Sequence, residues 1–398
     1  MRYDFSTVLE RAGHDLIAAE KIPFENVSAA EGVSRIPMWV ADMSFPTAPC
    51  ILEAVRRRME FPNFGYFSES EAYYQAILDW QRKRNGAEDL TREEIGYENG
   101  VLGGISSAIR AFTSPGDGIL LHAPTYIGFQ HVLEDTGRRA VLSPLVRDEK
   151  GVWRMDYGDM DARLRKEKIH LAIFCSPHNP TGRVWERWEI EKAMEVYAAN
   201  DCLVISDEIW SDLILPGHRH IPTQRISEDA RERTVAFYSP SKTFSLAGMI
   251  SSYHTVYSPR LRDRLRREGG LTHYNSQNVL SMAALIGAYT EGEPWLEELL
   301  TVLDGNIQYA CDFFRQAYPE IRIMRPQGTY MLYLDCGDWC RQRGKTIGEL
   351  QRAGVEAGVI WQDGEAFCWP DTIRMNLALP RSLLEEAMNR LGRLKIRG

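Results

Sequence analysis

Short apolar runs alternate with amphipathic stretches through the middle of the chain. Between residues 95 and 256 the runs are rich in Val, Ile and Leu and predict strands, and the stretches between them predict helices. The predicted strands are Ile119–His122, Arg139–Leu142, His170–Cys175, Cys202–Ser206, Thr234–Phe237 and Ile250–Val256. The predicted helices include Gly104–Phe112, Phe129–Asp135, Trp185–Ala199 and Pro259–Arg267. Continuous apolar strands separated by helices predict a mostly parallel sheet covered on both faces, with ligands beyond the carboxyl ends of the strands.

The pattern changes on both sides of this region. Thr47 and Pro49 suit the start of a helix that runs to Met59, and a second helix is expected from Tyr73 to Arg84. A long helix from Pro294 to Tyr318 is followed by a smaller α+β series. The members of that series are the strands Ile321–Met324, Thr329–Leu334 and Ile373–Leu377 and the helices Ile347–Ala357 and Arg381–Leu394.

This order predicts an α/β fold with two domains. We expect a large domain at residues 47–290 and a small C-terminal domain at 291–398 that includes the long connecting helix. The N-terminal segment, residues 1–46, is expected to join the small domain. A length of 398 residues is in line with this division, because it is too long for one simple core.

Composition excludes several classes of protein. The formal net charge of −8 argues against nucleic acid or an anionic membrane as the main partner. Apolar runs of about 18 residues, which could span a membrane, are absent, and the N-terminus lacks the apolar core of a signal peptide. The seven cysteines are scattered without a zinc-binding pattern. We therefore expect a cytoplasmic protein with reduced thiols and no metal site.

Lys242 is the first candidate for chemistry. It lies in Tyr238-Ser-Pro-Ser-Lys-Thr-Phe-Ser245, directly after the predicted strand Thr234–Phe237. A lysine between small hydroxyl residues packs poorly but can hold an amine near an anionic cofactor. Taken alone, a surface lysine in a polar loop is the simpler interpretation, so the other strand ends decide between the two.

Further polar residues follow predicted strands. Gly100-Val-Leu-Gly-Gly-Ile105 opens a helix, and its glycines let backbone N–H groups approach a phosphate, although its spacing matches neither a dinucleotide motif nor a P-loop. Tyr126 ends a strand, where its ring can stack on a flat cofactor or pack in the core. Asn179, in the rigid turn Cys175-Ser-Pro-His-Asn-Pro-Thr-Gly-Arg183, can donate to a ring oxygen, whereas His178 is expected to be structural.

Three charged residues stand in apolar surroundings. Asp207 ends a very apolar strand, so its burial is costly unless a cation or strong donor pairs with it, and a protonated pyridine nitrogen is such a partner. Arg374, on a late strand, can bind the α-carboxylate of a substrate in a bidentate way. An internal salt bridge is the alternative for both. Asp42, within the apolar segment Ile36–Pro46, likewise needs a partner or a function.

Together these residue types fit one chemistry. A lysine carries a carbonyl cofactor as a Schiff base, an aspartate keeps the pyridine ring protonated, and an asparagine binds the phenolic oxygen. A glycine-rich helix start binds the phosphate, and an arginine binds the substrate carboxylate. Such an arrangement makes pyridoxal phosphate (PLP) an electron sink.

The motifs, in this order, resemble fold-type I PLP-dependent transferases and, more narrowly, the cystathionine β-lyase (carbon–sulfur lyase) subgroup of the class I/II aminotransferase superfamily. The resemblance covers nearly the whole chain. The motifs similar to the subgroup include Trp39-Val-Ala-Asp-Met43, Phe64-Gly-Tyr66, Cys175-Ser-Pro-His-Asn-Pro180, Gly182-Arg-Val-Trp185 and Gly328-Thr-Tyr330.

The resemblance implies a role for each candidate residue. Lys242 would carry PLP and shuttle protons, Asp207 would pair with the pyridine nitrogen, and Tyr66 would complete the catalytic set. The implied cofactor-binding residues are Val101, Leu102, Tyr126, Asn179, Asp207, Trp210, Ser239, Ser241 and Lys242. The implied substrate-binding residues are Asp42, Tyr66, Tyr330 and Arg374. Because Tyr66 would reach into the neighbouring subunit's site, the resemblance also implies a homodimer.

The chain departs from the related patterns at several positions. Trp210 stands where many aminotransferases have a tyrosine, and its indole N–H can donate one hydrogen bond but carries no phenol proton. Met249 and Ile250 occupy the places of a phosphate-binding arginine, which suits the lyase subgroup better than aminotransferases. Ser245 replaces the usual asparagine, and Glu10–Leu16 departs from the subgroup's pattern at the substrate-entry lip.

The expected activity is β-elimination on an amino-acid substrate. Cystathionine or another cysteine S-conjugate would yield a thiol, pyruvate and ammonia. An aminotransferase on the same scaffold is the main alternative, and an amino-acid racemase is a smaller one. A regulatory binding role, in addition to lyase activity, is a further alternative from a different class.

Overall fold

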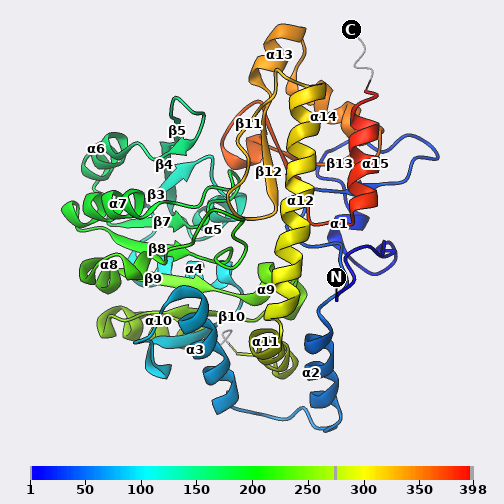
Figure 1. Ribbon diagram of the computed structural model, residues 1–398. Helices are drawn as coiled ribbons and strands as arrows, with labels where there is room; N and C mark the ends of the chain where they lie inside the picture. Colours follow the sequence, from blue (N-terminus) through cyan, green and yellow to red (C-terminus); the bar gives the residue numbers. More distant parts are fainter. Residues whose placement is uncertain (1, 273–275, 395–398) are drawn as a thin grey trace. The chain divides into compact units, whose positions relative to one another are not determined.

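The chain separates into two compact units in the computed structural model, which describes residues 2–272 and 276–394 (Figure 1). Residue 1 and the parts of the expected domains at residues 273–275 and 395–398 lie outside the described residues. The first unit comprises the chain up to Pro46, Pro180–Gly182, and the chain from Glu297 onward, and the second comprises Thr47–Asn179 and Arg183–Leu296. The second unit ends inside helix α12 (Glu293–Ala317), whereas the expected limit is residue 290.

A seven-stranded sheet with the order β2-β10-β9-β8-β7-β3-β4 forms the centre of the second unit. Its parallel strands are β3 (Gly118–Ala123), β4 (Arg139–Pro144), β7 (Leu171–Cys175), β8 (Leu203–Asp207) and β9 (Thr234–Tyr238). The remaining strands, β2 (Ile95–Glu98) and β10 (Ser252–Thr255), pair antiparallel at one edge. The mostly parallel sheet is thus confirmed, and the predicted strand Ile250–Val256 is shorter than expected and runs antiparallel.

Helices cover both faces of this sheet, as the apolar strands require. On one face, α4 (Val101–Phe112), α5 (Ile127–Asp135) and α10 (Pro259–Thr272) pack on the strands in a core that includes Ile105, Phe129, Ile173, Ile205 and Phe237. On the other face lie α6 (Tyr157–Glu167) and α7 (Arg187–Ala199), where Ser143 bonds to Asp159 and His122 to Tyr197. Since side chains alternate along a strand, a residue at a strand end lies on the same face as the residue two positions before it.

Helix α11 (Val279–Glu291), which packs against α2 (Pro49–Met59) and α3 (Glu71–Asn85), is absent from the sequence-based predictions. Its first ten residues are almost all apolar or small, so they show no 3.6-residue alternation, as is typical of a helix buried on all sides. Five other helices of the described chain are also absent from the predictions, namely α1 (Ile17–Glu20), α6, α8 (Glu228–Arg233), α9 (Pro240–Thr243) and α13 (Gly337–Arg343).

The first unit contains a four-stranded sheet with the order β11-β12-β15-β14. The strands are β11 (Arg322–Ile323), β12 (Met331–Asp335), β14 (Gln362–Asp363) and β15 (Thr372–Asn376). Its helices are α1 (Ile17–Glu20), most of α12, α13, α14 (Ile347–Glu356) and α15 (Arg381–Leu391). The N-terminal segment belongs to this unit, because β1 (Ile36–Pro37) pairs in parallel with β13 (Val359–Ile360).

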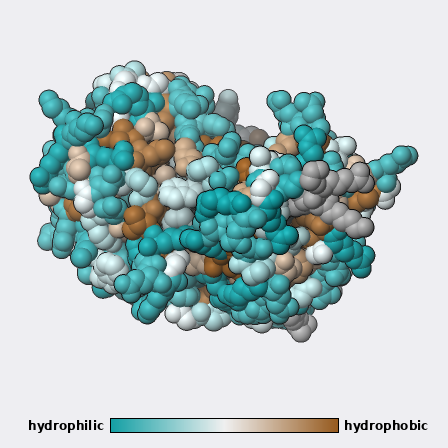
Figure 2. Space-filling view, turned by 90° about the horizontal axis from the view of Figure 1, so that it is seen from above, coloured by the Kyte–Doolittle hydropathy of each residue, from teal (hydrophilic) through white to brown (hydrophobic). Residues whose placement is uncertain are grey.

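Hydrophilic residues predominate on the face drawn in Figure 2, where hydrophobic residues occur in scattered groups. Within the described residues, none of the helices combines the length and apolar character needed to cross a membrane. Groups of three or more histidine, cysteine or acidic side chains arranged to hold a metal ion are also absent from these parts of the chain.

Candidate active site

Lys242 lies on a single helical turn, α9 (Pro240–Thr243), directly after β9. Serine at the N-cap and proline at the first helical position favour a helix start here, and Ser239 Oγ accepts a hydrogen bond from the Ser241 N–H at 3.1 Å. The hydroxyls of Ser239 and Ser241 are 2.7 Å apart, and Ser239 also donates to the Ser251 carbonyl at 2.9 Å. This turn therefore brings an amine and two hydroxyl groups together at the end of the strand.

Asp207 is the last residue of β8, the strand that neighbours β9 in the sheet. Its position, two residues after Ile205, places it on the face that α4 and α5 cover. The carboxylate is 4% exposed, and burial raises its pKa to about 7, opposed by a hydrogen bond from the Ile209 N–H at 3.2 Å and by the charge of Lys242. The raised pKa means that the groups around Asp207 only partly stabilise its charged form. A further cation, such as a pyridinium N–H, would stabilise it.

Trp210 and Lys242 lie close to each other. Lys242 Nζ is 5.8 Å from the centroid of the Trp210 indole ring, which is a cation–π distance. Trp210 is 2% exposed and belongs to the loop that follows Asp207. The structure thus brings Asp207, Trp210 and Lys242 together, as the positions at adjacent strand ends predict.

Tyr126 and Leu102 meet over Gly128 on the α4/α5 face of the sheet. A Cβ atom added at Gly128 would lie 2.5 Å from Tyr126 Cε1 and 2.9 Å from Leu102 Cδ1, so only glycine leaves room for these side chains. Helix α4, which begins at Val101, follows Gly100 with φ +80°, a backbone conformation that favours glycine. The N–H groups in the first turn of a helix point toward its start, so this helix start suits an anion on the face that carries Asp207.

Asn179 is fixed in the turn after β7 and is 3% exposed. The turn closes on itself, because the His178 N–H donates to the Arg183 carbonyl at 2.8 Å. The Asn179 backbone N–H faces the Cys175 sulfur, and burial next to Asp207 raises the pKa of the Cys175 thiol. Burial lowers the pKa of His178 to about 3, so this histidine is neutral, in agreement with a structural role.

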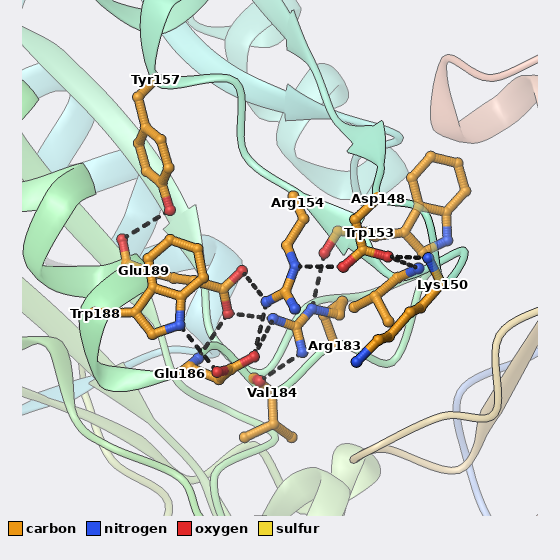
Figure 3. Close-up of polar contacts among 11 residues, drawn as sticks. Asp148, Lys150, Trp153, Arg154, Tyr157, Arg183, Val184, Glu186, Trp188 and Glu189 are labelled. Atoms are coloured by element: carbon orange, nitrogen blue, oxygen red, sulfur yellow. Dashed lines mark hydrogen bonds and ion pairs between the residues drawn. The ribbon is translucent and has the colours of Figure 1, made fainter.

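A buried ion-pair network, which the sequence-based prediction missed, holds the end of this turn (Figure 3). Arg183 and Glu189 form an ion pair, and both side chains are fully buried. Arg183 Nε also donates to the Trp153 carbonyl at 2.9 Å. Arg154 joins the network through Glu189 at 2.9 Å and Glu186 at 2.7 Å. Glu186 and Glu189 form a capping box at the start of α7, and their three-residue spacing is the feature of the sequence that could have indicated this network.

In the first unit, three polar side chains donate hydrogen bonds to the backbone of residues 39–42. They are the predicted site residues Arg374 and Tyr330, together with Asn376. Arg374 Nη2 donates to the carbonyl of residue 39 at 2.8 Å, and the Tyr330 hydroxyl donates to that of residue 41 at 3.0 Å. Asn376 Nδ2 donates to the carbonyls of residues 40 and 42 at 2.6 and 2.5 Å. Asn376 was not among the predicted site residues, and its two partners lie more than 330 positions away in the sequence.

Asp42 has an internal partner, as its apolar surroundings require. Its carboxylate forms an ion pair of 2.5 Å with Arg11, which also donates to Ser44 Oγ at 2.8 Å. Arg11 lies within Glu10–Leu16, the region that departs from the subgroup's pattern. Asp42 therefore has the partner that the sequence requires, and its contact with substrate stays a prediction.

Tyr66 lies on the surface and is not packed into a hydrophobic core. Its side chain is fully exposed, and Phe61 and Phe64 in the same loop are 65% and 58% exposed. Arg58 extends over the Phe64 ring at 5.4 Å from its centroid. So many exposed aromatic rings in one short loop are typical of a surface that another protein covers.

Residues 36–391 match the model of the aminotransferase class I and II family, so the chain belongs to this family. It is 31% identical to cystathionine β-lyase PatB of Bacillus subtilis (strain 168), over 94% of this chain and 96% of that protein. Among solved structures, PLP-containing cystalysin from Treponema denticola is 29% identical, with a TM-score of 0.92 over 99% of both chains. The PLP-bound C–S lyase of Staphylococcus hominis is 28% identical, with a TM-score of 0.89 over 98% of both chains. These similarities confirm the predicted fold class and family.

Proposed function

We propose that this chain is a PLP-dependent carbon–sulfur β-lyase acting on cystathionine or other cysteine S-conjugates. The observation that carries the proposal is the buried Asp207 carboxylate, with its raised pKa, beside the Lys242 turn at the adjacent strand end. With water, the reaction converts the substrate to a thiol, pyruvate and ammonia. The cytoplasm, where thiols stay reduced, is the proposed location.

The residues present fit PLP. The start of α4 at Val101 and Leu102 can bind a phosphate through backbone N–H groups. The Ser239 and Ser241 hydroxyls can also bind it by exchanging their present hydrogen bonds to each other and to Ser251. Tyr126 supplies an aromatic face, and Asn179 an amide donor for a ring oxygen. These groups follow the ends of four strands of the same sheet, β2, β3, β7 and β9. The donor set is therefore that of a site for a flat, phosphorylated pyridine.

When bound to Lys242, PLP supplies an electron sink for the bonds at the substrate's Cα. Asp207 keeps the ring nitrogen protonated, because a buried carboxylate is stabilised by a cation. The Lys242 amine, freed by the substrate amino group, accepts the α-proton at Nζ and can deliver it to the leaving thiolate. Arg374, whose guanidinium can bind a carboxylate in a bidentate way, orients the substrate.

The test is incubation of the purified, PLP-loaded protein with L-cystathionine, with pyruvate and free thiol measured together. Equal amounts of pyruvate and homocysteine are expected. Exchange of amino groups with 2-oxoglutarate faster than pyruvate release would instead identify an aminotransferase. The absence of both, with a change in cofactor absorbance on adding an amino acid, would remove the lyase assignment and leave racemisation.

Tyr66 supports a second part of this proposal, a homodimer in which its hydroxyl reaches the partner's site. The exposed loop that carries Phe61, Phe64 and Tyr66 is the proposed contact surface. Sedimentation should give twice the chain mass, and mixing a Tyr66→Phe variant with a Lys242→Ala variant should restore part of the activity through mixed dimers. A monomer with full activity would contradict the shared site.

Asparagine at position 207 is expected to stabilise the cofactor-free protein more as pH rises. The folded pKa of Asp207, about 7, is above the ordinary value of 3.8, so its favourable contribution is complete below pH 3.8 and is lost as pH rises through 7. Between about pH 5 and pH 8, the advantage of Asp207→Asn over the unchanged protein should grow by roughly 2–3 kcal/mol. Urea unfolding of both proteins at the two pH values measures this difference.

The same Asp207→Asn variant, loaded with PLP, is expected to lose most of its lyase activity, because the ring nitrogen loses its anionic partner. A pH-independent stability difference between the two cofactor-free proteins would show that Asp207 titrates normally. Full activity of the variant would remove Asp207 from its proposed role.

A further inference from the structure

The turn that carries Lys242 is hydrogen-bonded to the loop of residues 207–213. Thr243 Oγ1 donates to Asp212 Oδ2 at 2.9 Å, and Thr243 and Asp212 are 0% and 4% exposed. The same loop carries Trp210, whose ring lies 5.8 Å from Lys242 Nζ. One loop, which begins at the cofactor-side Asp207, therefore meets consecutive residues of the lysine turn at two points.

Asp212 is itself held in a rigid setting. The Trp80 indole N–H lies 3.2 Å from both carboxylate oxygens, and Arg84 Nε lies 3.5 Å from Oδ1. Trp80 stacks on Tyr289 with ring centroids 4.7 Å apart and an angle of 2° between the planes. The acceptor for Thr243 is thus fixed by aromatic packing and by a charged partner on α3, and it has little freedom to move.

Helix α9 depends on such attachments. It has four residues, and a single helical turn is unstable without outside contacts. The Phe244 ring packs against Trp80 and Trp295 at centroid distances of 5.9 and 5.8 Å, but these contacts are not directional. The Thr243–Asp212 hydrogen bond is directional and adjoins Lys242 in the chain, so it can fix the direction of the lysine side chain.

We propose that Asp212 is a positioning residue, which acts through Thr243 Oγ1 to hold the Lys242 turn and so places Lys242 Nζ for proton transfer at the substrate's α-carbon. The proposal rests on the proposed function, because it needs Lys242 to be the proton-transferring group. A misplacement of about 1 Å in such a group can reduce the rate by about 100-fold.

The test compares Thr243→Val, which removes the hydrogen bond at nearly equal volume, with Thr243→Ser, which keeps it. We expect kcat of the valine variant to fall by roughly 10- to 100-fold with KM changed less than about twofold. The pH midpoint at which the absorbance of bound PLP changes should shift in the valine variant. The serine variant should keep both the rate and the midpoint close to those of the unchanged protein.

Thr234→Val is the matched control. Thr234 is a fully buried threonine on β9, and its hydroxyl has no hydrogen-bond partner among the described residues. The control should leave kcat and the absorbance midpoint unchanged. If Thr243→Val behaves like this control, or lowers only the melting temperature, the positioning role is wrong.

Asp212→Asn, which keeps an acceptor oxygen but removes the charge, provides a second route if Thr243→Val does not fold. Its midpoint should shift in the same direction, by less, and an unchanged kcat and midpoint would contradict the positioning role. Where Thr243→Val does fold, the two effects should not add in the double variant, because both act on one interaction. A shifted midpoint in a protein that releases no pyruvate would support the positioning of Lys242 and remove only the lyase assignment.

Discussion

Replacing Lys242 with alanine is expected to lower kcat for pyruvate release by at least about 10⁴-fold, because one side chain both carries the cofactor and moves the α-proton. The fold should survive, since Lys242 is only half-buried and its turn is held by Thr243 and Phe244. Pyruvate release and thermal unfolding, measured on the same preparation, separate the two effects. A small primary amine added in solution should restore part of the rate by accepting the proton.

Lys192→Ala is the control for this experiment. Lys192 is exposed on α7 and lies over the Tyr157 and Trp188 rings at 5.7 and 5.6 Å, on the opposite face of the sheet. Its replacement removes a lysine without touching the proposed site, so the rate should stay within about twofold. Substantial pyruvate release by purified Lys242→Ala would exclude the whole scheme, whatever the control shows.

The second large effect concerns stability. Glu189→Ala is expected to lower the free energy of unfolding by about 3–5 kcal/mol, because it removes the buried carboxylate partner of the fully buried Arg183 and leaves the half-exposed Glu186, at 3.9 Å, as a weaker one. Burial already lowers the pKa of Arg183, and the charge of Glu189 opposes this shift. Denaturant unfolding followed by tryptophan fluorescence measures the loss, and Trp185, whose ring lies 5.1 Å from the Arg183 guanidinium, reports on this region.

Glu191→Ala on the same helix is the matched control. Glu191 pairs with Arg187 at 3.4 Å, but the two side chains are 42% and 54% exposed, so the pair should contribute less than about 0.5 kcal/mol. Equal losses for the two variants would show that burial of the Arg183–Glu189 pair has no special weight. A loss of PLP affinity in Glu189→Ala alone would further link this pair to the turn that carries Asn179.

The sequence predicts the parallel strands well because each is a continuous apolar run that ends at a polar residue. The same contrast identifies Lys242, Asp207 and Asn179, since polar groups at the ends of buried strands are unusual. Strand orientation is not encoded in this way, and so β10 looks like its parallel neighbours although it runs antiparallel. Helix α11 is not predicted because it is apolar on every side and so lacks the periodic pattern by which a helix is recognised.

The residues that support the site were harder to predict. Asn376 and Arg11 hold the segment of residues 39–42, and Asp212 holds Thr243, but each partner lies 31 or more positions away in the sequence. Nothing local in the chain distinguishes these residues from ordinary surface polar groups. Ser245 has a φ of +55°, a backbone conformation that asparagine adopts more readily than serine.

The pairing of β1 with β13 has a consequence for the order of events during synthesis. Ile36 lies beside Val359, so β1 cannot find its partner strand until almost the whole chain has left the ribosome. At about 5–20 residues per second, the intervening stretch takes roughly 15–60 s to make. The second unit ends at Leu296 and is therefore synthesised before Val359. We expect it to fold first, while the N-terminal segment, with its apolar Ile36–Pro46 stretch, remains accessible to chaperones and proteases.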